Sequence, residues 1–354
     1  MVALHNPQAF QRVATPGRAR LAPARDRRVA VVLNANARAV DAKAVRWVSR
    51  VVPERDLFLS HTLEEGEEIS QTLIERGYDA VFWGGGDGTF AAGMRSVLRA
   101  ATEQGKRIPE MGVVRLGTGN AMADAIGAGP ANERGLADDL RRARKCESRR
   151  RVPLLDLEGM PTVFCGFGLD AQILQDHHTI VDGLKRVGLG ETIRSAGLRY
   201  FLSVASRSIP RFVATDRPEV VAVNRGSTAV RVDADGRQIG APIPNGRVLW
   251  RGPVTLASCG TIPFYGLGMR IFPHADRQPG RFQLRLSDFS AAEALAHLPK
   301  IWTGRINHPK VADFLVDEVE LVLSRPAPMQ ASGDVFGLRE RANIRFWPRP
   351  VAVV

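Results

Sequence analysis

The stretch "FWGGGDGTF", residues 82–90, restricts the fold of this chain more than any other feature. Four glycines and one aspartate follow directly on an apolar run that is typical of a buried strand. Glycines at the end of a strand remove the β-carbons, so backbone N–H groups can close around an anion, and a helix that starts there adds its partial positive charge. The stretch therefore predicts a strand–loop–helix unit that binds a phosphate group.

Apolar strands and amphipathic helices alternate on both sides of this loop. One strand is expected to end at Asn34, and further strands are expected at 56–60, 79–84 and 111–117. This alternation over 28–127 predicts an α/β nucleotide-binding domain whose parallel sheet is covered by helices on both faces. In such a sheet, ligands bind at the carboxyl ends of the strands, which is where the glycine loop stands.

After Arg151 the pattern changes to short strand-like segments separated by turn sequences such as "DADGRQ" and "QPGR". They predict a second, antiparallel β-rich domain, interrupted by a helical stretch around 171–207. We therefore expect a disordered basic tail over 1–27, the α/β domain over 28–150 and the β-rich domain over 151–340.

The net charge of +12 is the unusual bulk property of the chain. A basic surface attracts nucleic acid, anionic lipid headgroups or phosphorylated substrates, and charge alone does not choose among them. Aromatic residues make up only 6% of the chain and do not alternate with basic ones, so a nucleic-acid-binding protein is not expected.

The cysteines and the apolar runs indicate a compartment. Three widely spaced cysteines show no metal-ligand spacing and favour a reducing cytoplasm over a disulfide framework. No apolar run approaches the roughly 18 residues that a membrane-spanning helix needs. We expect a cytoplasmic protein.

Asp87, inside the glycine loop, helps to decide which class of phosphate-binding site the loop belongs to. The Walker A pattern G-x-x-x-x-G-K-[ST] does not occur, and 86–91 matches the dinucleotide pattern G-x-G-x-x-A without the acidic residue that should end the next strand. A buried carboxylate beside phosphates repels them unless it binds a metal or takes up a proton. This combination points to phosphoryl transfer.

A second glycine-rich turn, "LGTGN" at 116–120, ends the next strand and precedes a helix. Two such turns on adjacent strand ends can hold one nucleotide from two sides. The ordered pair is therefore a stronger signal than either turn alone.

In their order along the chain, Asn34, "GGDGT" (85–89) and "LGTGN" (116–120) resemble the diacylglycerol kinase catalytic domain. This superfamily includes bacterial lipid kinases, sphingosine kinases and ceramide kinases, and is more distantly related to NAD kinases. The resemblance implies an α/β nucleotide domain and a β-sandwich-like domain, with a last strand, at about 341–354, that packs back on the first. Later segments that also match the family are 154–173, 265–276 and 304–311.

The resemblance further implies an ATP-dependent kinase that phosphorylates a lipid hydroxyl, with ATP between the two domains and Mg²⁺ on its phosphates. Asp87 would be the essential carboxylate and, in the sphingosine kinase branch, the general base. Asp170 would lie near the lipid headgroup. Contacts to ATP would come from Asn34, Thr62, Gly85, Gly86, Asp87, Gly88, Thr89, Gly117, Thr118, Gly119 and Asn120.

The chain departs from the family in four places, two of which concern carboxylates. Bacterial members carry an Asp-Gly-Glu triplet where this chain has Ser332-Gly333-Asp334. Serine does not act as a base without help, so Asp334 or Asp87 takes over, or the chain is a nucleotide-binding pseudokinase or regulatory relative. Pro279 stands where some bacterial members have a ligand of a structural magnesium ion, and the metal ligands of this chain stay open.

The expected partner is a lipid substrate at an anionic membrane surface, where each Lys or Arg contributes about 1 kcal/mol to binding. We expect peripheral, transient association with the membrane. The sequence leaves open which lipid is the acceptor and whether the chain forms a homo-oligomer.

Overall fold

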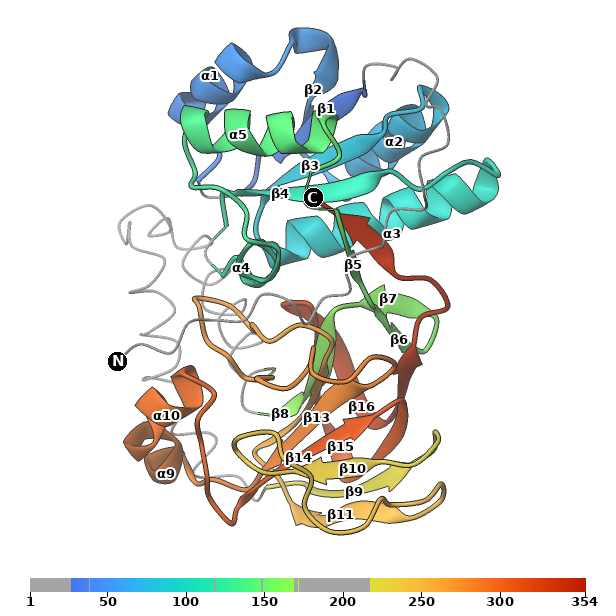
Figure 1. Cartoon of the computed structure of the whole chain (residues 1–354), viewed down its shortest axis with the longest axis vertical. Coiled ribbons are helices and arrows are strands. Elements are labelled where there is room, and N and C mark those ends of the chain that lie inside the picture. The colour runs from blue at the N-terminus through green and yellow to red at the C-terminus, as the bar shows by residue number, and fades with distance from the viewer. Residues whose placement is uncertain (1–26, 38, 118, 148, 169–170, 172–216) are drawn as a thin grey trace, which may run out of the picture. The chain divides into compact units, whose positions relative to one another are not determined.

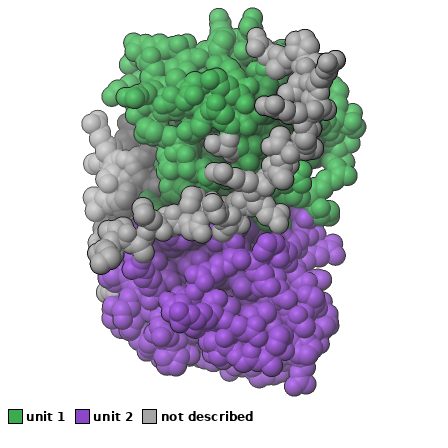
Figure 2. Space-filling model, in the orientation of Figure 1, with its two compact units in different colours: residues 1–154, 266–268, 348–354 green, residues 155–265, 269–347 purple. Residues whose placement is uncertain are grey.

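The computed structural model describes residues 27–37, 39–117, 119–147, 149–168, 171 and 217–354. Two compact units make up the chain, and Figure 2 shows them in different colours. Most of the tail expected over 1–27 and of the helical stretch expected around 171–207 lies outside the described residues. Unit 1 comprises 1–154, 266–268 and 348–354, and unit 2 comprises 155–265 and 269–347.

Unit 1 is built on a six-stranded sheet with the strand order β2-β1-β3-β4-β17-β5. The pairs β1–β2, β1–β3, β3–β4 and β4–β17 are parallel, and β5 is antiparallel to β17. The strands are β1 (Val29–Asn34), β2 (Leu57–Ser60), β3 (Ala80–Gly85), β4 (Glu110–Arg115), β5 (Arg150–Val152) and β17 (Val351–Val353).

The helices of unit 1 alternate with its first strands (Figure 1). Local side chains begin several of them: Asp41 accepts the backbone N–H of Ala44 at 2.7 Å, and Thr62 accepts that of Glu65 at 3.1 Å. Such N-caps satisfy donors that a helix end otherwise leaves open. The helices are α1 (Ala42–Val51), the 3-10 turn η2 (Glu54–Asp56), α2 (Leu63–Glu75), α3 (Asp87–Glu103), α4 (Ala121–Ile126) and α5 (Glu133–Arg144).

Helices cover both faces of the unit 1 sheet. Phe82 of β3 packs in the core formed with α1 and α5. The next residue, Trp83, points to the opposite face, where its ring lies against Gly93 of α3; a β-carbon on Gly93 would come within 2.4 Å of it. This alternation explains why the strand reads as one continuous apolar run.

Unit 2 is an antiparallel, β-rich unit with the strand order β10-β14-β13-β12-β8-β15-β16-β6-β7, to which β9 and β11 are attached through β15. Its strands are β6 (Leu155–Leu157), β7 (Met160–Thr162), β8 (Phe164–Gly168), β9 (Glu219–Asn224), β10 (Val230–Val232), β11 (Val248–Pro253), β12 (Leu256–Gly260), β13 (Phe282–Ser287), β14 (Val311–Val316), β15 (Glu318–Ala331) and β16 (Asp334–Phe346). Two short helices, α9 (Ala291–Ala296) and α10 (Leu298–Trp302), lie between β13 and β14.

Strand β15 organises the core of unit 2. Its first half pairs with β9 and its end pairs with β8, while β16 runs beside it with a change of register between Val322 and Ala327. Buried side chains such as Phe167, Leu284 and Phe314 fill the interior. The α/β unit and the antiparallel unit confirm the predicted fold class.

The strand that returns to the first unit is shorter than expected. Residues 341–346 belong to β16, where Ala342 and Ile344 are buried in the core of unit 2 and Ile344 pairs with Leu157. Only Val351–Val353 joins the sheet of unit 1. The prolines at 348 and 350 separate the two strands, because a proline cannot donate to a strand ladder.

Among the helices of the described residues, none combines the length and the apolar character that crossing a bilayer requires.

Candidate functional site

The predicted nucleotide contacts of unit 1 lie at the carboxyl edge of its parallel sheet, meaning the side where β1 to β4 end. Asn34 is the last residue of β1, and Thr62 follows β2 by two residues. Gly85 ends β3, and the turn at 116–120 follows β4. Since β2, β1, β3 and β4 are neighbours in that order, four separate sequence segments meet at one edge.

The two glycine-rich turns touch each other through their backbones. A β-carbon on Gly117 would lie 2.1 Å from the Cα of Gly86 and 2.9 Å from the carbonyl oxygen of Gly85. No side chain fits at such distances, so glycine is required at 117 by the approach of the two turns. At the point of contact, Gly86 and Gly117 are both partly exposed.

Helix α3 begins inside the first turn. Its first hydrogen bond of the helical ladder runs from the N–H of Phe90 to the carbonyl of Gly86 at 3.1 Å. The N–H groups of Asp87, Gly88 and Thr89 therefore point out of the helix end, where helical geometry leaves them available. Because α3 is 17 residues long, its partial positive charge also acts at this end.

Asp87 joins the two turns. Its carboxylate oxygens accept the backbone N–H groups of Ala121 and Met122, each at 3.0 Å, at the first turn of α4. Burial raises the pKa of Asp87, and the nearby carboxylate of Asp124 acts in the same direction, while the two N–H donors lower it. The carboxyl group is held in place and is poorly solvated, so it favours a cation or a proton beside it.

Asn34 and Thr89 connect β1 to the start of α3. The side-chain amide of Asn34 donates to the hydroxyl of Thr89 at 3.0 Å, and its carbonyl oxygen accepts the N–H of Asn36. A β-carbon on Gly85 would come within 2.4 Å of the Thr89 hydroxyl. These contacts hold the first turn against the neighbouring strand.

Asn120 closes the second turn. Its side chain both accepts the N–H of Gly117 at 3.2 Å and donates to the carbonyl of Gly117 at 2.7 Å. Its backbone has the left-handed φ of 53°, which Asn tolerates better than most residues. Gly119 accepts the N–H of Leu267 at 2.7 Å, a contact within unit 1, whereas Thr118 lies outside the described residues.

Thr62 has a structural task at this edge. It is exposed, and its hydroxyl is the N-cap of α2, while Glu65 turns back to accept the N–H of His61 at 2.7 Å. A hydroxyl that accepts one N–H can still donate its own proton to a ligand.

The remaining predicted residues belong to unit 2. Ser332 is fully buried, and its hydroxyl lies 2.6 Å from that of Thr162 and accepts the N–H of Val163 at 3.2 Å. Asp334, two residues later, is exposed at the start of β16. Asp170 lies outside the described residues.

Sequence reasoning missed Arg115, the last residue of β4. Its guanidinium group contacts Asp124 at 2.5 Å and donates to the carbonyls of Ala123 and Ala128. It holds α4 in position and neutralises the second carboxylate near Asp87. The available signal was a charged residue directly after an apolar strand and before the glycine turn.

The carboxylates of unit 1 are compatible with a magnesium ion that arrives with a nucleotide. The described residues contain no group of three or more His, Cys, Asp or Glu side chains that could hold a metal ion by themselves. A nucleotide-bound Mg²⁺ needs only one or two carboxylates, because phosphates and waters complete its shell. Asp87, poorly solvated beside the helix end, is the carboxylate that would hold it.

Two family profiles match this chain. That of the "Diacylglycerol kinase catalytic domain" matches residues 28–148, and that of the "YegS C-terminal NAD kinase beta sandwich-like domain" matches residues 226–354. The first match contains both glycine turns and the second contains Asp334. No curated protein matches the chain.

Solved structures share the fold. One, a candidate diacylglycerol kinase from Bacillus anthracis str. Sterne, is 15% identical with a TM-score of 0.62, over 92% of this chain and 96% of that chain. Another, described as a diacylglycerol kinase from the same organism, is 14% identical with a TM-score of 0.59 over the same shares. The likeness extends over both units of the chain.

Proposed function

Because the chain belongs to the diacylglycerol kinase catalytic-domain family, we propose that it is an ATP-dependent kinase that phosphorylates the hydroxyl of a lipid. The acceptor would be a diacylglycerol-like or sphingoid-like molecule. The observation that carries the proposal is the pair of hydrogen bonds that the Asp87 carboxylate accepts from the start of α4. Because Asp87 is the first residue of α3, these bonds hold the two glycine turns together at one edge of the sheet.

Each part of this edge has a task in the proposed reaction. The N–H groups at the start of α3 bind the ATP phosphates, and Asn34 and Thr89 keep that turn in place. Asp87 would hold Mg²⁺, which neutralises charge on the transferred phosphoryl group. The lipid hydroxyl oxygen forms a bond to the γ-phosphorus, the bond from that phosphorus to the β–γ bridging oxygen breaks, and ADP leaves.

The proton of the lipid hydroxyl needs an acceptor. Asp87 would already hold Mg²⁺, whereas Asp334 is an exposed carboxylate. The hydrogen bonds of the buried Ser332 hydroxyl to Thr162 and Val163 support leaving that residue out of the reaction. We therefore assign the proton to Asp334.

Transfer of labelled γ-phosphate from ATP with Mg²⁺ tests the proposal. The acceptors are diacylglycerol, monoacylglycerol, ceramide and sphingosine in anionic micelles, with Asp87→Asn and Asp334→Asn beside the unchanged protein. Asp138→Asn on α5 and Asp235→Asn in unit 2 are matched controls, because both carboxylates are exposed. A labelled lipid that is lost in the first pair and kept in the controls supports the proposal.

A second candidate is a nucleotide-binding relative without turnover. The burial of Ser332 favours it, because the family's catalytic aspartate has become a structural hydroxyl. Calorimetry separates the two candidates: ATP binding without any labelled lipid would favour this second function over the kinase.

The proposed enzyme works at an anionic membrane surface from the cytoplasm. The net charge of +12 supports this, as does the lipid nature of the proposed acceptor.

A further inference from the structure

The helix α10 (Leu298–Trp302) has no buried residue. All of its side chains except Lys300 are apolar. The exposed fraction is 39% for Leu298 and 37% for Trp302, and Ile301 is half-buried. A helix in a globular protein normally buries its apolar side against a core. Here that side is open to the surroundings, so it is available to a partner.

Two cations, Lys300 and Arg305, accompany these apolar side chains in the same short segment. Lys300 and Arg305 are exposed, and no carboxylate pairs with either of them within the part of the chain that the structure describes. The residues 298–305, which we call the α10 tip, contain no Asp or Glu. The tip is therefore locally positive and apolar at once.

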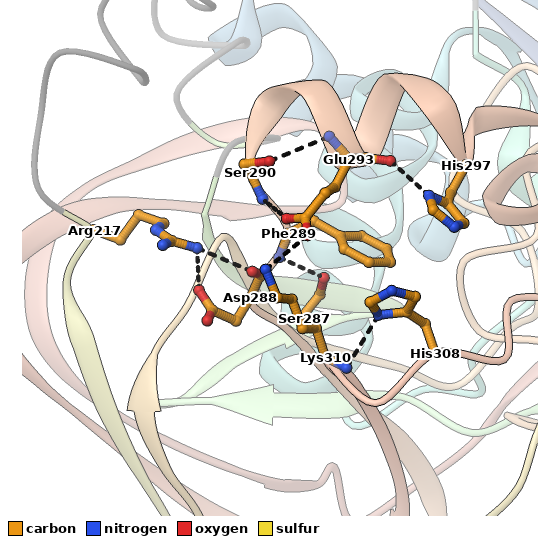
Figure 3. Close-up of polar contacts among 9 residues, drawn as sticks. All are labelled: Arg217, Ser287, Asp288, Phe289, Ser290, Glu293, His297, His308 and Lys310. Atoms are coloured by element: carbon orange, nitrogen blue, oxygen red, sulfur yellow. Dashed lines mark hydrogen bonds and ion pairs between the residues drawn. The ribbon is translucent and has the colours of Figure 1, made fainter.

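The carboxylates of this region are held at the base of the two helices, as Figure 3 shows. Asp288 pairs with Arg217, and Glu293 pairs with Lys310 at 2.7 Å. The hydrogen bond from Lys310, followed by that from the N–H of Ser290, lowers the pKa of Glu293 to about 2. Both acids are already paired with cations, so they do not cancel the charge of the tip.

Ring contacts also hold the two helices against the residues on either side of them. The ring of buried Phe289 stacks on that of His297, with centroids 5.4 Å apart, and meets His308 edge-on at 4.8 Å (Figure 3). The ring Nδ1 of His297 donates to the carbonyl of Glu293 at 2.9 Å, the direction that a carbonyl partner requires.

The far end of α10 is fastened as well. The carbonyl of Trp302 accepts the N–H of Arg270 at 2.9 Å, and the N–H of Arg305 donates to the carbonyl of Lys300 at 2.9 Å. Gly304 is buried with a left-handed φ of 73°, and Ile306 is buried after it. The tip is thus held at both ends by backbone hydrogen bonds, while the side chains of Leu298 and Trp302 stay partly exposed.

We propose that the α10 tip is the surface by which this protein docks on an anionic lipid bilayer, with Leu298, Ile301 and Trp302 entering the headgroup region and Lys300 and Arg305 contacting lipid phosphates. Trp is favoured at the interface between lipid and water, and Lys and Arg keep their charged ends among the headgroups while their stems lie on apolar surface. The α10 tip is where the proposed kinase would meet its membrane, so this proposal rests on the proposed function. Binding of the tip to lipid does not itself require any phosphate transfer.

Vesicle sedimentation of the full chain without ATP tests the docking surface. The probes are phosphatidylcholine vesicles with and without an equal part of phosphatidylglycerol. We expect binding to the anionic vesicles alone, weakened about 30-fold by Lys300→Glu with Arg305→Glu and at least about tenfold by Trp302→Ala.

Matched controls separate docking at the tip from general attraction. Arg247→Glu with Arg251→Glu changes the net charge equally on exposed positions next to and within β11, and Ile239→Ala removes a side chain that is 45% exposed. Both should bind as the unchanged protein does. The proposal would be overturned if the controls lost as much vesicle binding as the tip variants, or if the tip variants bound unchanged. It would also be overturned if the protein self-associated through Trp302, in a concentration-dependent way, instead of binding vesicles.

A water-soluble, short-chain diacylglycerol separates failure of docking from failure of the proposed function. The tip variants should phosphorylate it at the rate of the unchanged protein. If the unchanged protein binds vesicles but phosphorylates no lipid, the proposed kinase function is wrong and the proposed docking surface still holds.

Discussion

Gly117 and Gly86 approach each other so closely that a β-carbon on Gly117 would lie 2.1 Å from the Cα of Gly86. The relation is not symmetrical, because a β-carbon on Gly86 would lie 3.5 Å from the Cα of Gly117, an ordinary contact. The two glycines therefore make a matched pair for testing how the turns are held together.

Gly117→Ala should lower the free energy of unfolding by about 1–3 kcal/mol, because the turns must move apart. It should also weaken ATP binding, since the helix end and the second turn lose their spacing. Gly86→Ala should cost less than about 1 kcal/mol. Urea unfolding and calorimetry measure both, and an alanine at 117 that is as harmless as one at 86 would contradict the geometry.

Asp87→Asn should impair both stability and turnover. The amide keeps one accepting oxygen, while its NH₂ group faces a backbone N–H that had an acceptor, so one donor stays unsatisfied at a cost of about 1–3 kcal/mol. Turnover should fall at least about 100-fold. Asp138→Asn, at an exposed position of α5, should leave both quantities unchanged. Activity of Asp87→Asn within a few-fold of the unchanged protein would argue against its role.

Ser332 and Asp334 should respond in opposite ways. Ser332→Ala removes the partner of Thr162 and Val163 and should cost about 1–2 kcal/mol of stability while ATP affinity stays the same. Asp334→Asn, at an exposed position, should leave unfolding unchanged and lower turnover at least about 100-fold. Thermal unfolding and the phosphate-transfer assay on both variants check these expectations. A loss of turnover in Ser332→Ala, with normal turnover in Asp334→Asn, would assign the proton acceptor to position 332 instead.

His274 should make the protein less stable in acid. It is buried, and its two ring nitrogens have no hydrogen-bond partner among the described residues. Burial lowers its pKa from 6.5 to about 4, although Asp313 acts in the opposite direction. Between those two pH values the unfolded chain takes up a proton that the folded chain does not, so stability falls as the pH falls.

The loss of folding free energy caused by His274 is absent above about pH 6.5 and reaches at most about 3 kcal/mol near pH 4. His274→Gln should flatten the decrease, as measured by urea unfolding across that range. Ile271→Val is the control, because it removes one methylene group from a buried neighbour without changing a titrating group. Identical slopes for His274→Gln and the unchanged protein would refute the assignment.

The local features of unit 1 could be predicted well. Strands were expected at 56–60 and 79–84, and the structure has β2 at Leu57–Ser60 and β3 at Ala80–Gly85. The start of α2 at Thr62 follows from a hydroxyl residue before an acidic turn. These features depend on neighbours within a few residues, which a sequence displays directly.

The return of the chain to unit 1 was harder to predict. The segment from about 341 was expected to pack on the first unit, yet Ala342 and Ile344 are buried in unit 2. An alternating strand shows that it has a buried face but not which core covers that face. The prolines at 348 and 350 were the available sign of the break.

By itself the sequence determined that two glycine turns end adjacent parallel strands and that a carboxylate stands in the first, because strand and helix periods and the need for glycine at close backbone contacts are local. Only the tertiary structure decided that Asp87 accepts hydrogen bonds from the start of α4 and that Ser332 is a buried hydrogen-bond partner of Thr162. The hydroxyls of Ser332 and Thr162 are 170 residues apart in the chain and 2.6 Å apart in the fold. Burial and hydrogen bonding at such positions are set by strands that meet only when the whole unit is assembled.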